Sequence, residues 1–460
     1  MKIDRKRSFV FLFMFSAAWL TIQSAKAQQQ PVVLTLHDAL QYALKNSTNA
    51  RKAALDVDNG NYKIDETRAR ALPQLSLSSS LTDQYKKQSF VFDSSFIKPG
   101  ATGAILVPAG TTWNSLSSIN LQQAIYDQSV FTGLKAAKST QQYYQLAAQL
   151  TDEQIIEQVA TAYYQVLVQR QNIVVIDSNI KNTTRVHDII NGQYENGLAK
   201  KIDVDRTQVT ISNLKAQRQQ IINAATQQEN ALKFYMGMEI ATPVSIPSSQ
   251  LDSIKPEDAP MLDSLDVSER TEFKILKKQD ELYTYNLAAY KAEYYPTLSL
   301  SASHSLNGVS EKFIIFRGVK HQGYWFDYGS ASLNLRVPLF NGFATRARVR
   351  QANVSLEKNR EDLRNTTLSL NLDYENAKTQ IRNSLITLSS QKENVQLAQE
   401  IFFNTQNNYN NGLAPLTDLL DSENSLTQAQ NNYSSALLDY KIAQIQLIKS
   451  QGQLKTLVNQ

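Results

Sequence analysis

The placement of proline constrains the fold of this 460-residue chain more than any other feature. Proline breaks the interior of a helix because it lacks the N–H donor and its ring clashes with the preceding turn. The chain has 11 prolines, yet the spans 127–242 and 339–414 contain none. Both spans are rich in Gln, Asn, Ala, Leu and Ile, so unusually long helices are expected there.

Apolar residues recur at coiled-coil spacing inside both spans. Steps of four and three residues connect a mostly apolar series in the first span: Ile155, Val159, Ala162, Val166, Gln169, Ile173, Ile176 and Ile180. The same kind of seam in the second span runs through Tyr374, Ala377, Ile381, Leu385 and Leu388. This spacing favours the packing of helix against helix. A helix over 129–191 would be roughly 90 Å long at ~1.5 Å per residue; the alternative is several shorter helices that fold back.

Four short segments alternate apolar and polar residues with the period of a strand. Strands are expected at about 74–88, 113–124, 297–308 and 324–337. Such alternation gives one face that can meet lipid and one that can meet water. Aromatic residues gather in the last segment, as they do at membrane interfaces: Tyr324, Trp325, Phe326 and Tyr328. Ordinary β-sandwich packing is the alternative.

The chain is internally duplicated. Residues 194–203, YENGLAKKID, recur as YNNGLAPLTD at 409–418, and ALPQLSLSSS at 71–80 matches YYPTLSLSAS at 294–303. Each half is expected to run helix, strand, strand, long helix, hairpin tip, helix. We therefore predict two structural repeats, 28–242 and 261–460, joined by a proline-rich linker at 243–260.

The first 27 residues have the pattern of a cleavable signal peptide. A basic start precedes a short apolar run, Phe9 to Ile22, and the small-x-small end Ala25-Lys26-Ala27. A membrane anchor is the alternative, but it needs about 20 apolar residues. Removal of residues 1–27 takes away five positive charges and one negative charge, which lowers the net charge from +5 to +1. No nucleic-acid partner is predicted from so small a charge.

The sequence predicts no enzyme. The absence of cysteine excludes disulfides, thiolate metal sites and a lipid-modified cysteine. The four histidines fall in different expected elements, and no HExxH, phosphate-loop or dinucleotide motif is present. We therefore expect no catalytic residue, no cofactor and no metal site.

Four strands are too few to form a membrane pore alone. Open strand edges are not tolerated in lipid, and transmembrane barrels start at about 8 strands. Strands must therefore be pooled between chains. Two chains would supply eight strands and three would supply twelve, and strand number alone does not decide between them.

The order and duplication of these features resemble the TolC-like outer-membrane efflux proteins over about residues 35–457. The resemblance rests on the signal peptide, the repeated helix-strand-strand-helix units, the proline at each helix-to-strand junction, the PLFNG turn at Pro338–Gly342 and the Y-x-x-G-L tips. It implies a mainly α fold with a small β part. It also implies a homotrimer in which a twelve-stranded transmembrane β-barrel continues into a long periplasmic α-helical barrel.

The resemblance implies a channel in the outer membrane of a Gram-negative cell, with most of the chain in the periplasm. Such a channel is the exit duct of a tripartite efflux or type I secretion system and passes small molecules or polypeptides. Its partners are a periplasmic adaptor and an inner-membrane transporter. The alternative function is that of a periplasmic coiled-coil adaptor without a channel of its own.

The resemblance places the hairpin tips at the periplasmic mouth, where the pore closes. The candidate gate residues are Tyr409, Asp418, Asp421, Tyr194, Asp203 and Arg206. Asp418 and Asp421 are three residues apart, hence on one helix face, and in a trimer they would form acidic rings that favour cations. Alternatively they are helix-start carboxylates stabilised by the helix dipole.

The same tips are candidate docking points for an adaptor, because small residues allow close approach of another helical tip. These docking residues are Gly197, Leu198, Ala199, Gly412, Leu413 and Ala414. The family often has a basic residue two positions after the tip glycine, where this chain has Ala199 and Ala414. Lys200, Lys201 or Arg206 is therefore the candidate substitute in a gate bond.

Overall fold

The structure is a computed structural model that describes residues 32–94, 99–100, 102–246, 265–313 and 323–459. The expected signal peptide, residues 1–27, and residues 247–260 of the expected linker lie outside the described residues. The chain divides into two compact units. The first unit comprises the described residues up to 54 with 147–273 and 366–459, and the second comprises 55–146 and 274–365. Each unit therefore takes segments from both sequence repeats.

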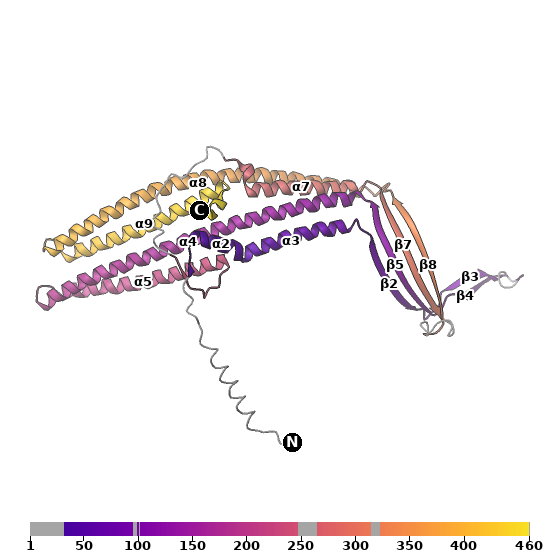
Figure 1. Cartoon of the computed structure of the whole chain (residues 1–460), viewed down its shortest axis with the longest axis horizontal. Coiled ribbons are helices and arrows are strands. Elements are labelled where there is room, and N and C mark those ends of the chain that lie inside the picture. Colours follow the sequence, from indigo (N-terminus) through magenta and orange to yellow (C-terminus); the bar gives the residue numbers. More distant parts are fainter. Residues whose placement is uncertain (1–31, 95–98, 101, 247–264, 314–322, 460) are drawn as a thin grey trace, which may run out of the picture. The chain divides into compact units, whose positions relative to one another are not determined.

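Long helices form two hairpins in the first unit (Figure 1). The first hairpin consists of α4 (Gln128–Glu195) and α5 (Lys201–Met236), and the second of α8 (Ala344–Asn410) and α9 (Leu416–Ser450). The portions of α4 and α8 that precede residues 147 and 366 belong to the second unit. The helix expected over 129–191 is continuous, so the alternative of several shorter helices is wrong.

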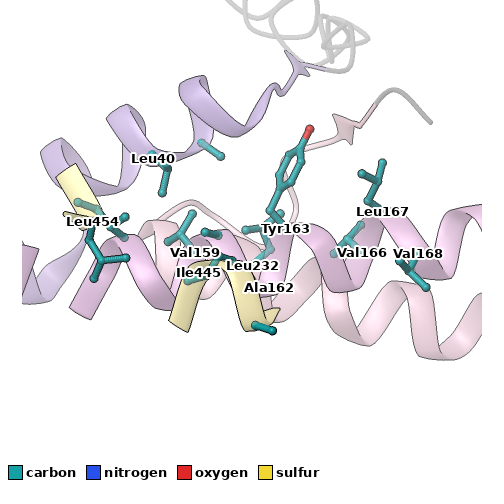
Figure 2. Packing of buried hydrophobic residues seen from close by; sticks show 14 of the residues in the cluster. Leu40, Val159, Ala162, Tyr163, Val166, Leu167, Val168, Leu232, Ile445 and Leu454 are labelled. Atoms are coloured by element: carbon teal, nitrogen blue, oxygen red, sulfur yellow. The ribbon is translucent and has the colours of Figure 1, made fainter. Parts of the chain in front are cut away.

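The core of the first unit lies where the hairpins meet shorter elements (Figure 2). Val159, Tyr163 and Val166 of α4 pack with Leu232 of α5 in this core. The other contributors shown are Ile445 of α9, Leu40 of α2 (Leu36–Asn46) and Leu454 of the short helix η5 (Leu454–Val458). Most of the predicted seam is buried in this core: Ile155, Val159, Ala162, Val166, Tyr374, Ala377, Ile381 and Leu388. Ile176 is also buried. Each large aliphatic side chain stabilises the packing by about 1.5–3 kcal/mol.

The start of the described chain is fastened to this core. Strand β1 (Val32–Val33) pairs in parallel with β6 (Val244–Ser245), so the first residues of the expected linker belong to a small sheet. The hydroxyl of Tyr163 donates a hydrogen bond to the carbonyl oxygen of Leu34 at 3.2 Å. Helix α2 begins at a capping box, in which Thr35 Oγ1 accepts a hydrogen bond from the Asp38 amide at 3.1 Å. These bonds satisfy backbone groups that would otherwise be unpaired.

The second unit holds an antiparallel sheet of four strands in the order β2-β5-β7-β8. The strands are β2 (Gln74–Asp83), β5 (Trp113–Tyr126), β7 (Thr297–Ser310) and β8 (Gly323–Arg336). Helices α3 (Thr48–Ala69) and α7 (Thr271–Ala292) precede β2 and β7. The first strand ends at Asp83 rather than near 88, and the second continues to Tyr126 rather than ending near 124. Strands β2 and β8 form the two edges of the sheet.

The two faces of the sheet differ in polarity. Residues paired directly across strands lie on the same face. One face carries the leucine pairs Leu75 with Leu121 and Leu300 with Leu333. On the other face the hydroxyls of Ser118 and Ser305 lie 2.8 Å apart. The alternation read from the sequence is thus an apolar face opposite a serine face.

A small hairpin in the connection between β2 and β5 was not predicted from the sequence. Strand β3 (Ser89–Asp93) pairs antiparallel with β4 (Ala104–Pro108). Two hydrogen bonds to Glu311 fix its base, one from Lys87 Nζ at 2.7 Å and one from Thr112 Oγ1 at 3.0 Å. Among the described helices none is long and apolar enough to cross a membrane.

Candidate functional site

Both hairpin tips have the same backbone conformation. Gly197 and Gly412 each have φ of +74°, in the left-handed region that favours glycine. In each tip the glycine amide donates to the carbonyl three residues earlier, at 2.9 and 3.0 Å. The next amide, of Leu198 or Leu413, donates to the carbonyl five residues earlier at 2.8 Å. These bonds form a Schellman closure, so the repeated decapeptide ends a helix in both copies.

Each tip exposes a leucine next to small residues. Leu198 is 80% exposed and Leu413 is 77% exposed, whereas Ala199 and Ala414 are half-buried. A Cβ atom added at Gly197 or Gly412 would meet no heavy atom within 4 Å. The glycines are therefore required by the backbone conformation and not by crowding. Each tip presents one large apolar side chain among small ones.

A cavity of about 440 Å³ lies between the two tips. Its lining brings together Asp203 and Arg206 of the first hairpin and Tyr409 of the second. The other lining residues are Ile190, Gln193, Leu198, Ala199, Lys200, Pro415, Leu416 and Thr417. Burial, and to a lesser extent the negative charge of Asp203, raises the pKa of Tyr409.

Arg206 is only weakly held by its own helix. Its Nη1 lies 3.9 Å from Asp203 Oδ1, and both side chains are partly exposed. An exposed pair at this distance contributes little stability. The guanidinium is therefore not fixed in place by this ion pair.

Three predicted gate residues lie outside the cavity lining. Asp418 and Asp421 are exposed on one face at the start of α9, and the Thr417 hydroxyl donates to Asp418 at 3.4 Å. Tyr194 is 42% exposed near the end of α4. Both interpretations of the aspartates, an acidic ring and helix-start carboxylates, fit these positions. The described part of the chain contains no group of three or more His, Asp or Glu side chains that could hold a metal ion.

A buried polar contact between α4 and α9 was not predicted from the sequence. Thr183 of α4 is fully buried and its Oγ1 lies 3.0 Å from Oε1 of Glu423 of α9, which is 5% exposed. One turn along, Asn179 Nδ2 donates to Thr427 Oγ1 at 2.8 Å. Burial raises the pKa of Glu423 to about 7, although the bond with Thr183 acts in the opposite direction. The sequence signal for this contact is a pair of polar residues four apart on each helix. Such pairs do not indicate which helices meet.

This fold, which comprises two long helical hairpins and a four-stranded sheet, defines a class of outer-membrane channels. A family model described as outer membrane efflux protein matches residues 39–238 and 270–453, which is most of the chain. The chain therefore belongs to the outer membrane efflux protein family. It is an outer-membrane channel for efflux or secretion with a periplasmic helical extension, a transporter and not an enzyme.

Curated relatives and solved structures agree with this assignment. The chain is 22% identical over 428 residues to outer membrane protein TolC of Escherichia coli, covering 91% of this chain and 82% of the relative. It is 23% identical over 337 residues to the alkaline protease secretion protein AprF of Pseudomonas aeruginosa, covering 71% and 67%. The outer membrane protein VceC of Vibrio cholerae superposes with a TM-score of 0.68 at 18% identity, over 91% of this chain and 96% of that one. The CmeC outer membrane channel of Campylobacter jejuni gives 0.69 at 13% identity, over 94% and 90%.

Proposed function

We propose that three copies of this chain form the exit duct of a tripartite efflux or type I secretion system. A periplasmic adaptor and an inner-membrane transporter would deliver small molecules or polypeptides to it. The observation that carries this proposal is the sheet, because β2 and β8 each leave one side unpaired within the chain. Lipid does not tolerate such edges. Pairing of β2 of one copy with β8 of the next removes them all and gives a twelve-stranded barrel from three sheets of four.

The two faces of the sheet support this arrangement. Leu75 and Leu77 are each 71% exposed, and Leu333 and Leu335 are 64% and 66% exposed, within a single chain. Such side chains are suited to lipid, and the serine face is suited to a wet pore. The periplasmic adaptor alternative gives no reason for exposed leucines that alternate with serines on the edge strands.

The oligomeric state tests the proposal directly. Native mass spectrometry of protein extracted from outer membranes in detergent should find three chains in each particle. Planar bilayers that contain the particle should show ion-conducting channels. A single chain recovered from the soluble periplasmic fraction would contradict the proposal and favour the adaptor alternative.

The tip leucines are proposed to contact the adaptor. Leu413→Asp should abolish efflux, measured as drug resistance of the cell, because a carboxylate replaces the apolar side chain at the contact. Leu198→Asp tests the first tip by the same measurement, because Leu198 is about as exposed as Leu413. The control is the amount of trimer in the outer membrane, which should not change. Full resistance of the Leu413→Asp strain would exclude a docking role for that tip.

Arg206 is proposed to help close the mouth, because it lines the cavity together with Tyr409 of the other hairpin. Arg206→Ser should raise the leak conductance of the reconstituted channel. Lys215→Ser is the matched control, since Lys215 is exposed on the same helix and outside the cavity lining. Equal conductance in the two variants would show that Arg206 has no special part in closure.

A further inference from the structure

Glu423 lies in apolar surroundings between the two hairpins. Glu423 lies three or four residues from Leu419, Leu420 and Leu426, on the same buried face of α9. These leucines form an apolar cluster with Val186 and Ile190 of α4 and Phe402 of α8. An ionised carboxylate is costly in such a place unless a cation or several donors compensate it. Its partner in the structure is the single hydroxyl of Thr183.

The two oxygen atoms near the Thr183 hydroxyl indicate the protonation state of Glu423. Thr183 Oγ1 lies 2.9 Å from the carbonyl oxygen of Asn179 and 3.0 Å from Glu423 Oε1. A hydroxyl carries one proton and can donate to only one of these oxygens. Threonine in a helix commonly donates to the carbonyl four residues earlier. With Thr183 as the donor, the two oxygens compete for one proton. A protonated Glu423 removes this competition, because it can donate to Thr183 Oγ1 while the Thr183 proton bonds to Asn179.

The charged groups on the neighbouring helices do not compensate an ionised Glu423. On α4, Lys181 and Arg185 are exposed, and the ring of His187 bonds to Thr207 Oγ1 of α5 at 2.8 Å. Glu400 of α8 and Asp421 of α9 are exposed and carry the same sign as Glu423. Within the described residues no cation forms an ion pair with Glu423.

We propose that Glu423 is a proton-controlled latch that holds α9 against α4 beside the tips when protonated and loosens the second hairpin from the first when ionised. The consequence, a mouth that opens more readily at higher pH, rests on the channel function proposed above. The pKa of about 7 places the change near neutral pH. A Glu423 side chain released to water has the ordinary value of 4.5. The packed state therefore binds the proton more tightly, and the packing weakens as pH rises from about 4.5 to about 7 and stays constant above.

Hydrogen–deuterium exchange of the intact trimer tests the latch. Protection of residues 179–190 and 416–427 should fall by about tenfold or more between pH 5 and pH 8, after correction for the intrinsic rate, since each pKa unit is a factor of about ten. Glu423→Gln keeps the shape without the charge, so its protection should not vary with pH. Glu400→Gln removes an exposed carboxylate of α8 and should retain the wild-type pH dependence.

Several outcomes would overturn the latch. Wild-type protection that is flat between pH 5 and pH 8 would do so by itself, even if Glu423→Gln failed to assemble. A pH dependence that persisted in Glu423→Gln would do so as well. The conductance of reconstituted channels is a separate measurement. A protein with pH-dependent exchange but no conductance would contradict the channel function and still support the latch.

Discussion

Single residues with the same backbone conformation differ in their surroundings. Gly237 ends α5 with φ of +70°, close to the value at the tip glycines. A Cβ atom at Gly237 would lie 2.6 Å from the Asn46 carbonyl oxygen and 2.9 Å from Ser47 Cα. The tip glycines have no such neighbour. The backbone of α5 therefore approaches the end of α2 in a way that only glycine permits.

This difference predicts unequal effects of one substitution. Gly197→Ala should cost about 1–2 kcal/mol of unfolding free energy, because alanine is strained at positive φ. Gly237→Ala should cost roughly 3 kcal/mol or more, because the backbone clash adds to that strain. Thermal unfolding of the detergent-solubilised protein measures both. Equal losses of unfolding free energy in the two variants would show that the backbone at Asn46 shifts at little cost to relieve the clash.

The buried hydroxyl of Thr183 offers a second comparison. Thr183→Val leaves the carboxyl of Glu423 without its partner and should cost about 1–3 kcal/mol of unfolding free energy. Thr184 is the control, since its half-buried hydroxyl donates to the Ile180 carbonyl oxygen at 2.7 Å and the bond lies within one helix. Thr184→Val should cost less than about 1 kcal/mol. A loss of unfolding free energy in Thr183→Val no larger than that in Thr184→Val would show that the contact with Glu423 contributes nothing to stability.

At the level of elements, long periodic signals made the helices and main strands predictable. Proline-free spans and apolar seams indicated α4 and α8, and period-two alternation indicated the four-stranded sheet. The β3–β4 hairpin was missed because its strands have five residues each and are joined by a long connection instead of a recognisable tight turn. The burial of Glu423 was not predicted, because acidic residues at the start of a helix are usually exposed, as the nearby Asp418 and Asp421 are. A seam indicates which side of a helix is buried, but not which helix covers it.

The capping box of α2 predicts a local effect on stability. Thr35→Ala removes the side-chain acceptor for the Asp38 amide and should lower the free energy of unfolding by about 1 kcal/mol. Thr226→Ala is the control in an exposed helix interior, where alanine is the better helix former by a few tenths of a kcal/mol. Chemical denaturation of both variants measures the difference. A neutral Thr35→Ala would show that tertiary contacts alone hold the start of α2.

At the level of the whole molecule, the sequence repeats and the compact units differ. The duplication is visible in the chain, whereas each unit collects either the hairpin part or the sheet part of both repeats. The periodicity of the sequence cannot reveal these units, because the units depend on which elements pair, such as β5 with β7 and α4 with α9. The tips were located correctly as turns, and their roles in gating and docking stay predictions.

The membrane orientation of the sheet can be tested with neighbouring residues on opposite faces. Leu77→Arg places a charge on the apolar face and should cost about 2–4 kcal/mol if the residue lies at mid-membrane. Trimer in the outer membrane should therefore decrease. Ser78→Arg lies on the serine face and should keep the trimer while changing its conductance. The reverse pattern in quantitative membrane fractionation would mean that the two faces are assigned wrongly.

The bonds that close each unit also limit when the chain can fold. Asn179 and Thr427 are 248 positions apart, and Lys87 and Glu311 are 224 apart. Contacts between such distant positions form slowly, because a long loop must close first. The second unit needs the chain as far as residue 365, and the first unit also needs α9. The early segments of both units therefore expose apolar surface that needs protection from aggregation until the later segments are available to cover it.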